Sequence, residues 1–170
     1  MPQTIHTVLI VTKAEDATAL ALGRDIAAWL GQRGVSAHVR PNPGDADRGV
    51  DPAVFTLAAR PDLVLVLGGD GTMLSVARRT EALDVPLLGL NLGKVGFLTA
   101  MCPADWPAKL ESLLATGPRV QPRMALGFTL LRNGREVAQG RALNDLVVNR
   151  GVLARLINLE LHVGGEWLGR

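Results

Sequence analysis

An uninterrupted apolar run, Leu63–Leu67, is followed at once by the glycine-rich segment 68–72 (Gly-Gly-Asp-Gly-Thr) and then by a stretch of helical character. Such a run is typical of a strand that is buried on both faces of a parallel sheet. Glycines at the carboxyl end of the strand expose backbone N–H groups where open α/β sheets bind ligands, and a helix that begins there favours bound anions. The segment therefore predicts an α/β sheet with a phosphate-binding edge.

Asp70 is the unusual residue of this segment, because a carboxylate repels phosphate. We expect it to hold a metal ion or to take a proton, which favours phosphoryl transfer over passive nucleotide binding. The segment lacks the Gly-Lys-Ser/Thr ending of a P-loop, and Leu74 stands where a dinucleotide-binding fingerprint needs a small residue. A plain strand-to-helix turn, with glycines for packing, remains the structural alternative.

The first two thirds of the chain alternate between strand and helix patterns. We predict strands at residues 7–11, 35–39, 63–67 and 86–90. We predict helices at residues 15–33, 72–79 and 104–115, with Thr72 as a cap of the second, and a loop at 41–52. Apolar strands separated by helices favour a doubly wound parallel sheet covered on both faces, which we assign to an α/β domain of residues 1–118.

The pattern changes after Gly117-Pro118. Predicted strands at 126–131 and 136–139 flank Asn133-Gly134, which is a strong hairpin signal. Further strands are expected at 142–149 and 156–163, with a turn at 164–165. We expect residues 119–170 to begin an all-β domain, a β-sandwich, that is incomplete because the chain stops within a hairpin.

Composition narrows the class of protein. The 170 residues carry 18 Lys and Arg against 16 Asp and Glu, interspersed, so no basic block indicates nucleic-acid binding. Cys102 is the single cysteine, which excludes an intramolecular disulfide and a cysteine metal cluster. No signal-peptide segment precedes the first strand, and no apolar run is long enough to span a bilayer, so we expect a cytoplasmic protein without membrane contact.

A second glycine-rich loop, residues 91–98, directly follows the predicted strand 86–90. If the two strands are adjacent and parallel, their loops form two walls of one crevice. Asn91 offers an amide there and Lys94 a cation, although a lone loop lysine is more often simply solvated. A third polar group, Asn144-Asp145, supplies an amide and a carboxylate suited to ribose hydroxyls or adenine nitrogens, but such a pair is often only a turn feature.

Taken in order, residues 68–72, 91–99 and 142–151 resemble the NAD kinases of bacterial type. The first segment is shared with diacylglycerol and sphingosine kinases and is similar to one in phosphofructokinases, so it indicates only a superfamily. The second and third are more specific, and the resemblance covers essentially the whole chain. It implies transfer of the γ-phosphoryl group of ATP, or of polyphosphate, to the 2′-hydroxyl on the adenosine ribose of NAD, which makes NADP.

The resemblance also implies roles for particular residues. Asp70 would accept the proton of that hydroxyl and lie near a divalent metal such as Mg²⁺, and no further protein metal ligand is assigned. Gly71 would let NAD approach the backbone, Asn144 and Asp145 would grip the bound dinucleotide, and Arg155 would also contact it. Members of the family are commonly homodimers or homotetramers.

Two departures from the family pattern matter. The family's pair is usually Asn-Glu, so the shorter Asp145 is expected to loosen the hydroxyl contact. Family members also continue well beyond the point where this chain ends, so we expect the chain alone to carry only part of the site. Two alternatives remain: a lipid kinase of the diacylglycerol type, against which the loop 91–98 counts, and a nucleotide-binding fragment without catalysis.

Overall fold

The computed structural model describes residues 4–43, 55, 57–93, 96–148 and 157–169. The chain divides into two compact units, Met1–Met124 and Ala125–Arg170, and each is described by itself. None of the helices in these described ranges is long and apolar enough to cross a membrane.

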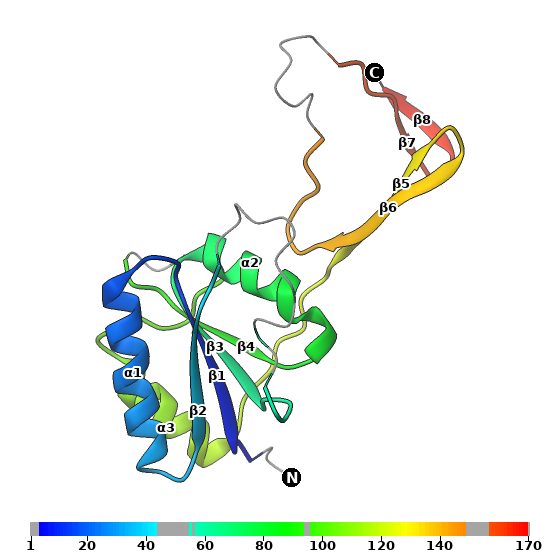
Figure 1. Ribbon diagram of the computed structural model, residues 1–170. Helices are drawn as coiled ribbons and strands as arrows, with labels where there is room; N and C mark the ends of the chain where they lie inside the picture. Colours follow the sequence, from blue (N-terminus) through cyan, green and yellow to red (C-terminus); the bar gives the residue numbers. More distant parts are fainter. Residues whose placement is uncertain (1–3, 44–54, 56, 94–95, 149–156, 170) are drawn as a thin grey trace. The chain divides into compact units, whose positions relative to one another are not determined.

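The first unit is built on a parallel sheet of four strands in the order β2-β1-β3-β4 (Figure 1). The strands are β1 (Thr7–Thr12), β2 (Ser36–Pro41), β3 (Leu63–Leu67) and β4 (Leu87–Leu90). The helices are α1 (Ala17–Gly31), α2 (Asp70–Thr80) and α3 (Trp106–Thr116), with a short 3₁₀ helix, η2 (Glu81–Leu83), after α2. The predicted parallel sheet is confirmed, and its strands lie within two residues of the expected bounds.

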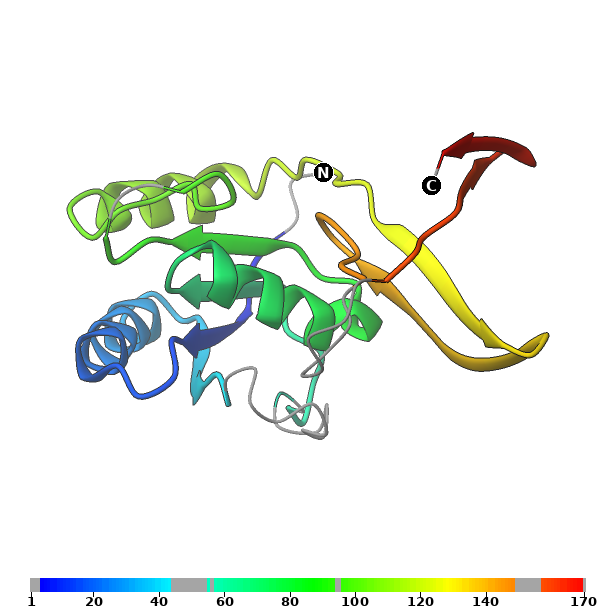
Figure 2. The same cartoon turned by 90° about the horizontal axis from the view of Figure 1, so that it is seen from above.

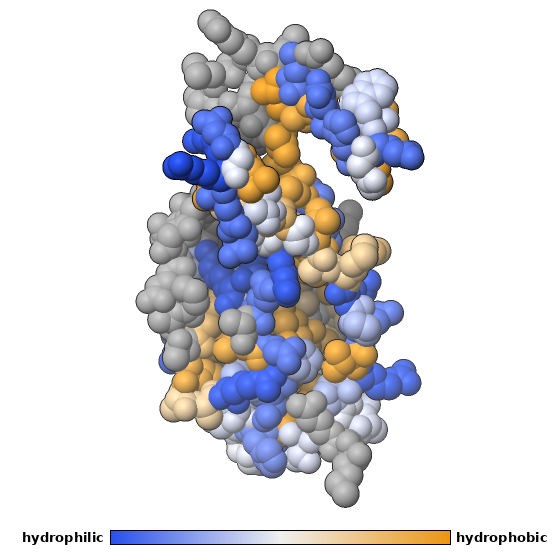
Figure 3. Space-filling model, turned by 90° about the vertical axis from the view of Figure 1, so that its right-hand side faces the viewer, coloured by the Kyte–Doolittle hydropathy of each residue, from blue (hydrophilic) through white to orange (hydrophobic). Residues whose placement is uncertain are grey.

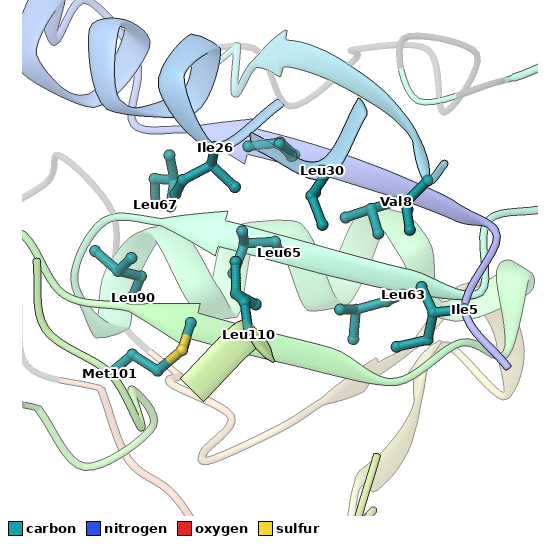
Figure 4. Close-up of a cluster of buried hydrophobic side chains, with 12 residues drawn as sticks. Ile5, Val8, Ile26, Leu30, Leu63, Leu65, Leu67, Leu90, Met101 and Leu110 are labelled. Carbon is teal, nitrogen blue, oxygen red and sulfur yellow. The ribbon is translucent and has the colours of Figure 1, made fainter. Parts of the chain in front are cut away.

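Successive side chains of β1 and β3 belong alternately to two separate hydrophobic clusters, one on each face of the sheet. The first cluster joins the strands to α1 and α3 and includes Val8, Ile10, Ile26, Leu30, Leu63, Leu65, Leu67 and Leu110 (Figure 4). The second joins them to α2 and includes Leu9, Val11, Val64, Val66, Met73 and Val76. Helices therefore cover both faces, with α2 opposite α1 and α3 (Figures 1 and 2). This explains the continuous apolar runs of β1 and β3.

The N-termini of α1 and α2 differ in their capping residues. α1 begins after Asp16, whose side chain accepts the Ala19 N–H at 3.0 Å. The expectation that Thr72 caps α2 is wrong, because that helix already begins at Asp70 with the extended Gly69 as its N-cap and without a side-chain cap. Glycine at the N-cap leaves the first N–H groups of the helix without a side-chain partner, as an anion-binding end requires.

The second unit consists of two antiparallel hairpins. β5 (Leu126–Arg132) and β6 (Arg135–Ala142) are joined through Asn133 and Gly134, both at positive φ, as the Asn-Gly signal predicts. β7 (Leu161–Val163) and β8 (Glu166–Gly169) are joined through the predicted turn at Gly164 and Gly165.

Two predicted strands of this unit are shorter than expected. β6 ends at Ala142, and residues 143–148 carry no strand, although 142–149 was predicted as one. Residues 157–160 also lie outside β7, which begins at Leu161. An apolar, β-branched run becomes a strand only when a neighbouring strand pairs with it, and these segments have no such neighbour among the described residues.

Candidate functional site

The two glycine-rich loops leave neighbouring strands at the same edge of the sheet. β3 and β4 are parallel, with Leu67 opposite Leu90, and the Gly68 N–H donates to the Leu90 carbonyl at 2.9 Å. The prediction that both loops follow adjacent parallel strands is therefore confirmed. This carboxyl edge is where open α/β sheets place their ligands.

Asp70 lies in the first turn of α2 and joins the two loops. One carboxylate oxygen, Oδ2, accepts the Phe97 N–H at 2.9 Å, and the other, Oδ1, accepts the Leu98 N–H at 3.1 Å. Two bonds to consecutive amides fix the plane of the carboxylate as well as its position. The side chain also lies at the positive end of the α2 dipole, where a negative charge is favoured.

Gly96 makes this contact sterically possible. A Cβ atom built on Gly96 would lie 2.7 Å from Asp70 Cγ and would collide with the carboxylate oxygens as well. The clashing atoms belong to a side chain held by two hydrogen bonds, so they cannot swing aside without losing them. Glycine at position 96 therefore permits the approach of the second loop to Asp70.

Gly71 is exposed at the start of α2, next to Asp70. A Cβ atom at either Gly69 or Gly71 would meet no described atom within 4 Å, so the backbone on this side of the helix end is open. By contrast, a Cβ atom on Gly68 would lie 2.6 Å from Thr72 Oγ1. The glycines thus have different roles, with Gly68 needed for packing and the other two leaving space.

Asn91 does not present its amide to a ligand at this edge, as its position after β4 had suggested. Its side chain is buried, with Nδ2 donating to Thr99 Oγ1 at 3.3 Å and Oδ1 accepting the Gly93 N–H at 3.0 Å. The amide therefore stabilises the loop itself. Lys94, the other residue singled out in this loop, lies outside the described residues.

Phe97 is a feature of the site that sequence reasoning missed. Its backbone N–H donates to Asp70, the residue is 79% exposed, and the Arg123 guanidinium carbon lies 5.8 Å from the centre of its ring. An exposed aromatic face beside a carboxylate offers a surface on which a heterocyclic base can stack. The available signal was Gly96 directly before it, since a glycine that lets the loop approach Asp70 also brings the next residue there.

Lys13 and Asp16 lie in the loop that leaves β1 at this same edge. The Lys13 N–H donates to the Leu67 carbonyl at 2.8 Å, which places the start of this loop beside the end of β3. The Lys13 ammonium is 3.6 Å from Asp16 Oδ2. The Ala19 N–H and, less strongly, the Lys13 charge hold the pKa of Asp16 below its usual value. A cation and a second helix N-terminus thus belong to the edge that carries Asp70.

A shallow hollow lies at the opposite, amino edge of the sheet. It is lined by Arg60, Pro61, Asp62, Asp84, Val85 and Pro86, which flank the starts of β3 and β4. The Arg60 guanidinium donates to the Leu83 and Asp84 carbonyls, and Asp62 accepts the His6 and Thr7 N–H groups. These polar groups hold loops together, so we place the functional site at the carboxyl edge instead.

The remaining sequence-predicted residues belong to the second unit. Asn144 and Asp145 lie two and three residues after the end of β6 and are exposed, within residues 143–148, which carry no strand. Arg155 lies outside the described residues. Asp70 and Gly71, which are sequence neighbours, thus belong to the first unit, and the neighbours Asn144 and Asp145 belong to the second.

Residues 52–117 match the protein family described as ATP-NAD kinase N-terminal domain. The chain is 53% identical over 164 residues to an NAD kinase of Nitratidesulfovibrio vulgaris, a match that covers 96% of this chain and 53% of the relative. It is 40% identical over 165 residues to an NAD kinase of Citrifermentans bemidjiense, which covers 95% of this chain and 57% of that relative. The chain thus spans about half the length of the curated relatives it matches.

A solved structure with a similar fold is that of yeast NADH kinase complexed with NADH. The TM-score is 0.79 at 21% sequence identity, and the match covers 98% of this chain and 52% of the other. At this identity the likeness shows the fold alone.

Proposed function

We propose that this chain, which belongs to the NAD kinase family, is part of an enzyme that transfers the γ-phosphoryl group of ATP to the 2′-hydroxyl on the adenosine ribose of NAD. The observation that carries the proposal is the Asp70 carboxylate, held in the first turn of α2 by the backbone of the second loop. Both loops lie within the residues that match the family. Polyphosphate is a second candidate donor.

Asp70 would act as the base for the acceptor hydroxyl. An alcohol is a weak nucleophile until its proton is taken, and phosphoryl transfer otherwise depends on positioning and charge neutralisation. Each carboxylate oxygen accepts one N–H bond and has a further lone pair. The carboxylate can therefore receive a proton from substrate while the loop still holds it in place.

The phosphates of the donor would lie at the open N-terminus of α2. The bare backbone at Gly69 and Gly71 allows close approach, and the helix end favours negative charge. These features support phosphate binding at the loop that holds the base, as a direct transfer between donor and acceptor requires.

A divalent ion such as Mg²⁺ fits this arrangement, with Asp70 and the donor phosphates as its ligands. Among the residues described, no group of three or more His, Cys, Asp and Glu is placed to bind a metal alone. Mg²⁺ is commonly held by one or two carboxylates together with substrate phosphates and water, and Asp70 supplies such a carboxylate. When bound, the ion would neutralise charge on the transferred group.

Each unit, taken by itself, offers residues that would contact the acceptor dinucleotide. In the first unit, Gly71 leaves room for NAD and the exposed Phe97 ring offers a stacking surface for a base. In the second, Asn144 and Asp145 are exposed and free of strand structure, with an amide and a carboxylate that suit ribose hydroxyls. Arg155 would add a cation.

The same family assignment supports four wider proposals. Residues 1–118 would form an α/β domain, and residues 119–170 would belong to a β-sandwich that binds NAD. The protein would be a cytoplasmic homodimer or homotetramer. The exposed apolar side chains of the two hairpins support the β-sandwich, because a sandwich buries one face of each sheet.

A coupled assay tests the activity directly. The full-length protein that contains this chain is incubated with ATP, Mg²⁺ and NAD, and NADP is measured with an NADP-specific dehydrogenase. We expect NADP to form, and a parallel reaction with a diacylglycerol to give no phosphorylated lipid. Lipid phosphorylation without NADP would instead favour the diacylglycerol kinase alternative. NAD binding by calorimetry without any turnover would favour a non-catalytic nucleotide-binding protein.

A further inference from the structure

We infer that Thr99 is a positioning residue for Asp70: its hydroxyl fixes the loop whose backbone amides hold the carboxylate. Thr99 is buried, and its Oγ1 accepts two hydrogen bonds, from the Gly96 N–H at 3.0 Å and from Asn91 Nδ2 at 3.3 Å. The residues after Gly96 are those whose N–H groups bind Asp70. The inference rests on the proposed function in one respect only, that Asp70 is the base.

The path from Thr99 to the carboxylate is short. Thr99 Oγ1 fixes the amide of Gly96, and the next amide along the chain, that of Phe97, donates to Asp70 Oδ2. Each peptide unit is planar, and the Phe97 N–H lies in the unit that begins at the Gly96 Cα atom, so a displacement of Gly96 also moves that N–H group. The hydroxyl therefore determines where the donors for Asp70 lie.

Thr99 is itself fixed to the sheet. Its Cγ2 methyl group packs against Gly89 of β4: a Cβ atom built on Gly89 would lie only 2.8 Å from this methyl carbon. The backbone just after it, at Ala100 and Met101, donates to the Gly89 carbonyl at 3.0 and 3.1 Å. The side chain thus has a rigid base in β4, from which its hydroxyl reaches into the loop.

Asn91 anchors the other end of the same loop. Its own N–H donates to the Met101 carbonyl at 2.9 Å, while its amide bonds both Thr99 and Gly93. The two buried polar side chains at the ends of the loop, Asn91 and Thr99, are therefore joined by a hydrogen bond to the Thr99 hydroxyl oxygen. Removing that oxygen leaves the buried Asn91 amide and the partly buried Gly96 N–H without their acceptor, which favours a rearrangement of the loop.

The test compares Thr99→Val with Thr99→Ser in the full-length protein. Valine keeps the shape of threonine and removes the oxygen, whereas serine keeps the oxygen and removes the methyl group. For Thr99→Val we expect kcat for NADP formation to fall about 10- to 100-fold, the scale of a misplaced catalytic group, with a much smaller change in KM for NAD. Thr99→Ser should restore most of kcat.

Thr80→Val is the matched control. Thr80 is also buried in the first unit, and its hydroxyl donates to the Val76 carbonyl at 2.9 Å, away from the second loop. The substitution removes a buried hydroxyl from the same domain without touching Asp70 or its donors. We expect it to lower stability while leaving kcat near that of the wild type.

A second readout is independent of activity. Amide hydrogen exchange at Phe97 and Leu98, measured by NMR, reports whether their N–H groups remain bonded to Asp70. We expect faster exchange in Thr99→Val and in Asp70→Asn, and slow exchange in Thr99→Ser and Thr80→Val. Unchanged exchange and unchanged kcat in Thr99→Val would overturn the inference, as would an equal loss in Thr99→Ser. A wild-type protein that makes no NADP would refute the proposed function, and the exchange data would still decide the role of Thr99.

Discussion

The two units of the chain use apolar residues in opposite ways. In the first, Leu65 at the centre of β3 is 0% exposed and is packed between helices and neighbouring strands. In the second, Leu130 in the middle of β5 is 51% exposed, and large apolar side chains of both hairpins lie open at the surface (Figure 3). A parallel sheet brings its own covering helices through its crossover connections, whereas a hairpin does not.

This difference shows which part of the chain can specify its structure alone. The first unit has buried clusters on both faces of its sheet, and its site loops are tied to that sheet by hydrogen bonds. The hairpins have no such buried clusters among their described residues, so their conformation is determined mainly by their turn residues. An isolated two-stranded ribbon is only marginally stable in water. We therefore expect substitutions of similar chemistry to have very different costs in the two units.

Leu65→Ala and Leu130→Ala form the strongest test of the comparison. In the 170-residue chain, we expect the first to lower the free energy of unfolding by about 2–5 kcal/mol, since it leaves a cavity in a closed cluster. The second should change it by less than about 0.5 kcal/mol, as for an exposed site. Urea denaturation followed by circular dichroism measures both.

Equal costs for the two leucines would break the comparison. Measuring Leu65→Ala and Leu130→Ala in the full-length protein gives a sharper comparison, because there a β-sandwich would cover β5. We expect the cost of Leu130→Ala to rise in that protein and the cost of Leu65→Ala to stay as it is.

The turn of the first hairpin gives a smaller effect. Gly134 has φ of 74°, so Gly134→Ala forces a left-handed conformation on a residue with a Cβ atom and should cost about 1–2 kcal/mol of hairpin stability. Gly127→Ala is the control, because Gly127 lies within β5 at an ordinary φ and a Cβ atom there meets no described atom within 4 Å. NMR amide exchange across β5 and β6 should increase only in the first variant.

The weakest effect that we predict is a pH dependence of the stability of the first unit, caused by Asp105. A hydrogen bond from Lys109, and then one from the Cys102 N–H, lowers the pKa of Asp105 from 3.8 to about 2. Because the folded-state pKa is depressed, the stabilisation is fully present above about pH 4 and is lost as pH falls through about 2.

Asp105→Asn removes this dependence. We expect thermal unfolding to show the variant less stable than the wild type at neutral pH, with the gap narrowing between about pH 4 and pH 2. A gap that stays constant over this range would show that the carboxylate charge is not its cause.

Local patterns predicted most of the first unit and the hairpin turns. The apolar run of β3 and the Asn133-Gly134 turn were correct because neighbouring residues alone determine them. The strand expected at 142–149 was wrong over residues 143–148, because its formation requires a pairing partner that no local pattern supplies.

The site was predicted in part for the same reason. Asp70 was identified as the unusual carboxylate of a phosphate-binding loop, yet its bonds to Phe97 and Leu98 span 27 and 28 positions in the chain. The internal role of Asn91 likewise depends on Thr99, which no spacing rule singled out. Contacts between loops follow from the arrangement of strands, so they become visible only once β3 and β4 are placed side by side.

The central claim, that Asp70 is the base of a phosphoryl transfer to NAD, is tested most directly by Asp70→Asn in the full-length protein. NADP formation and NAD binding are measured on the same preparations of variant and wild type. The account predicts a fall in kcat of at least about 100-fold while NAD still binds, because an amide cannot take the hydroxyl proton. A variant that forms NADP at the wild-type rate would contradict it.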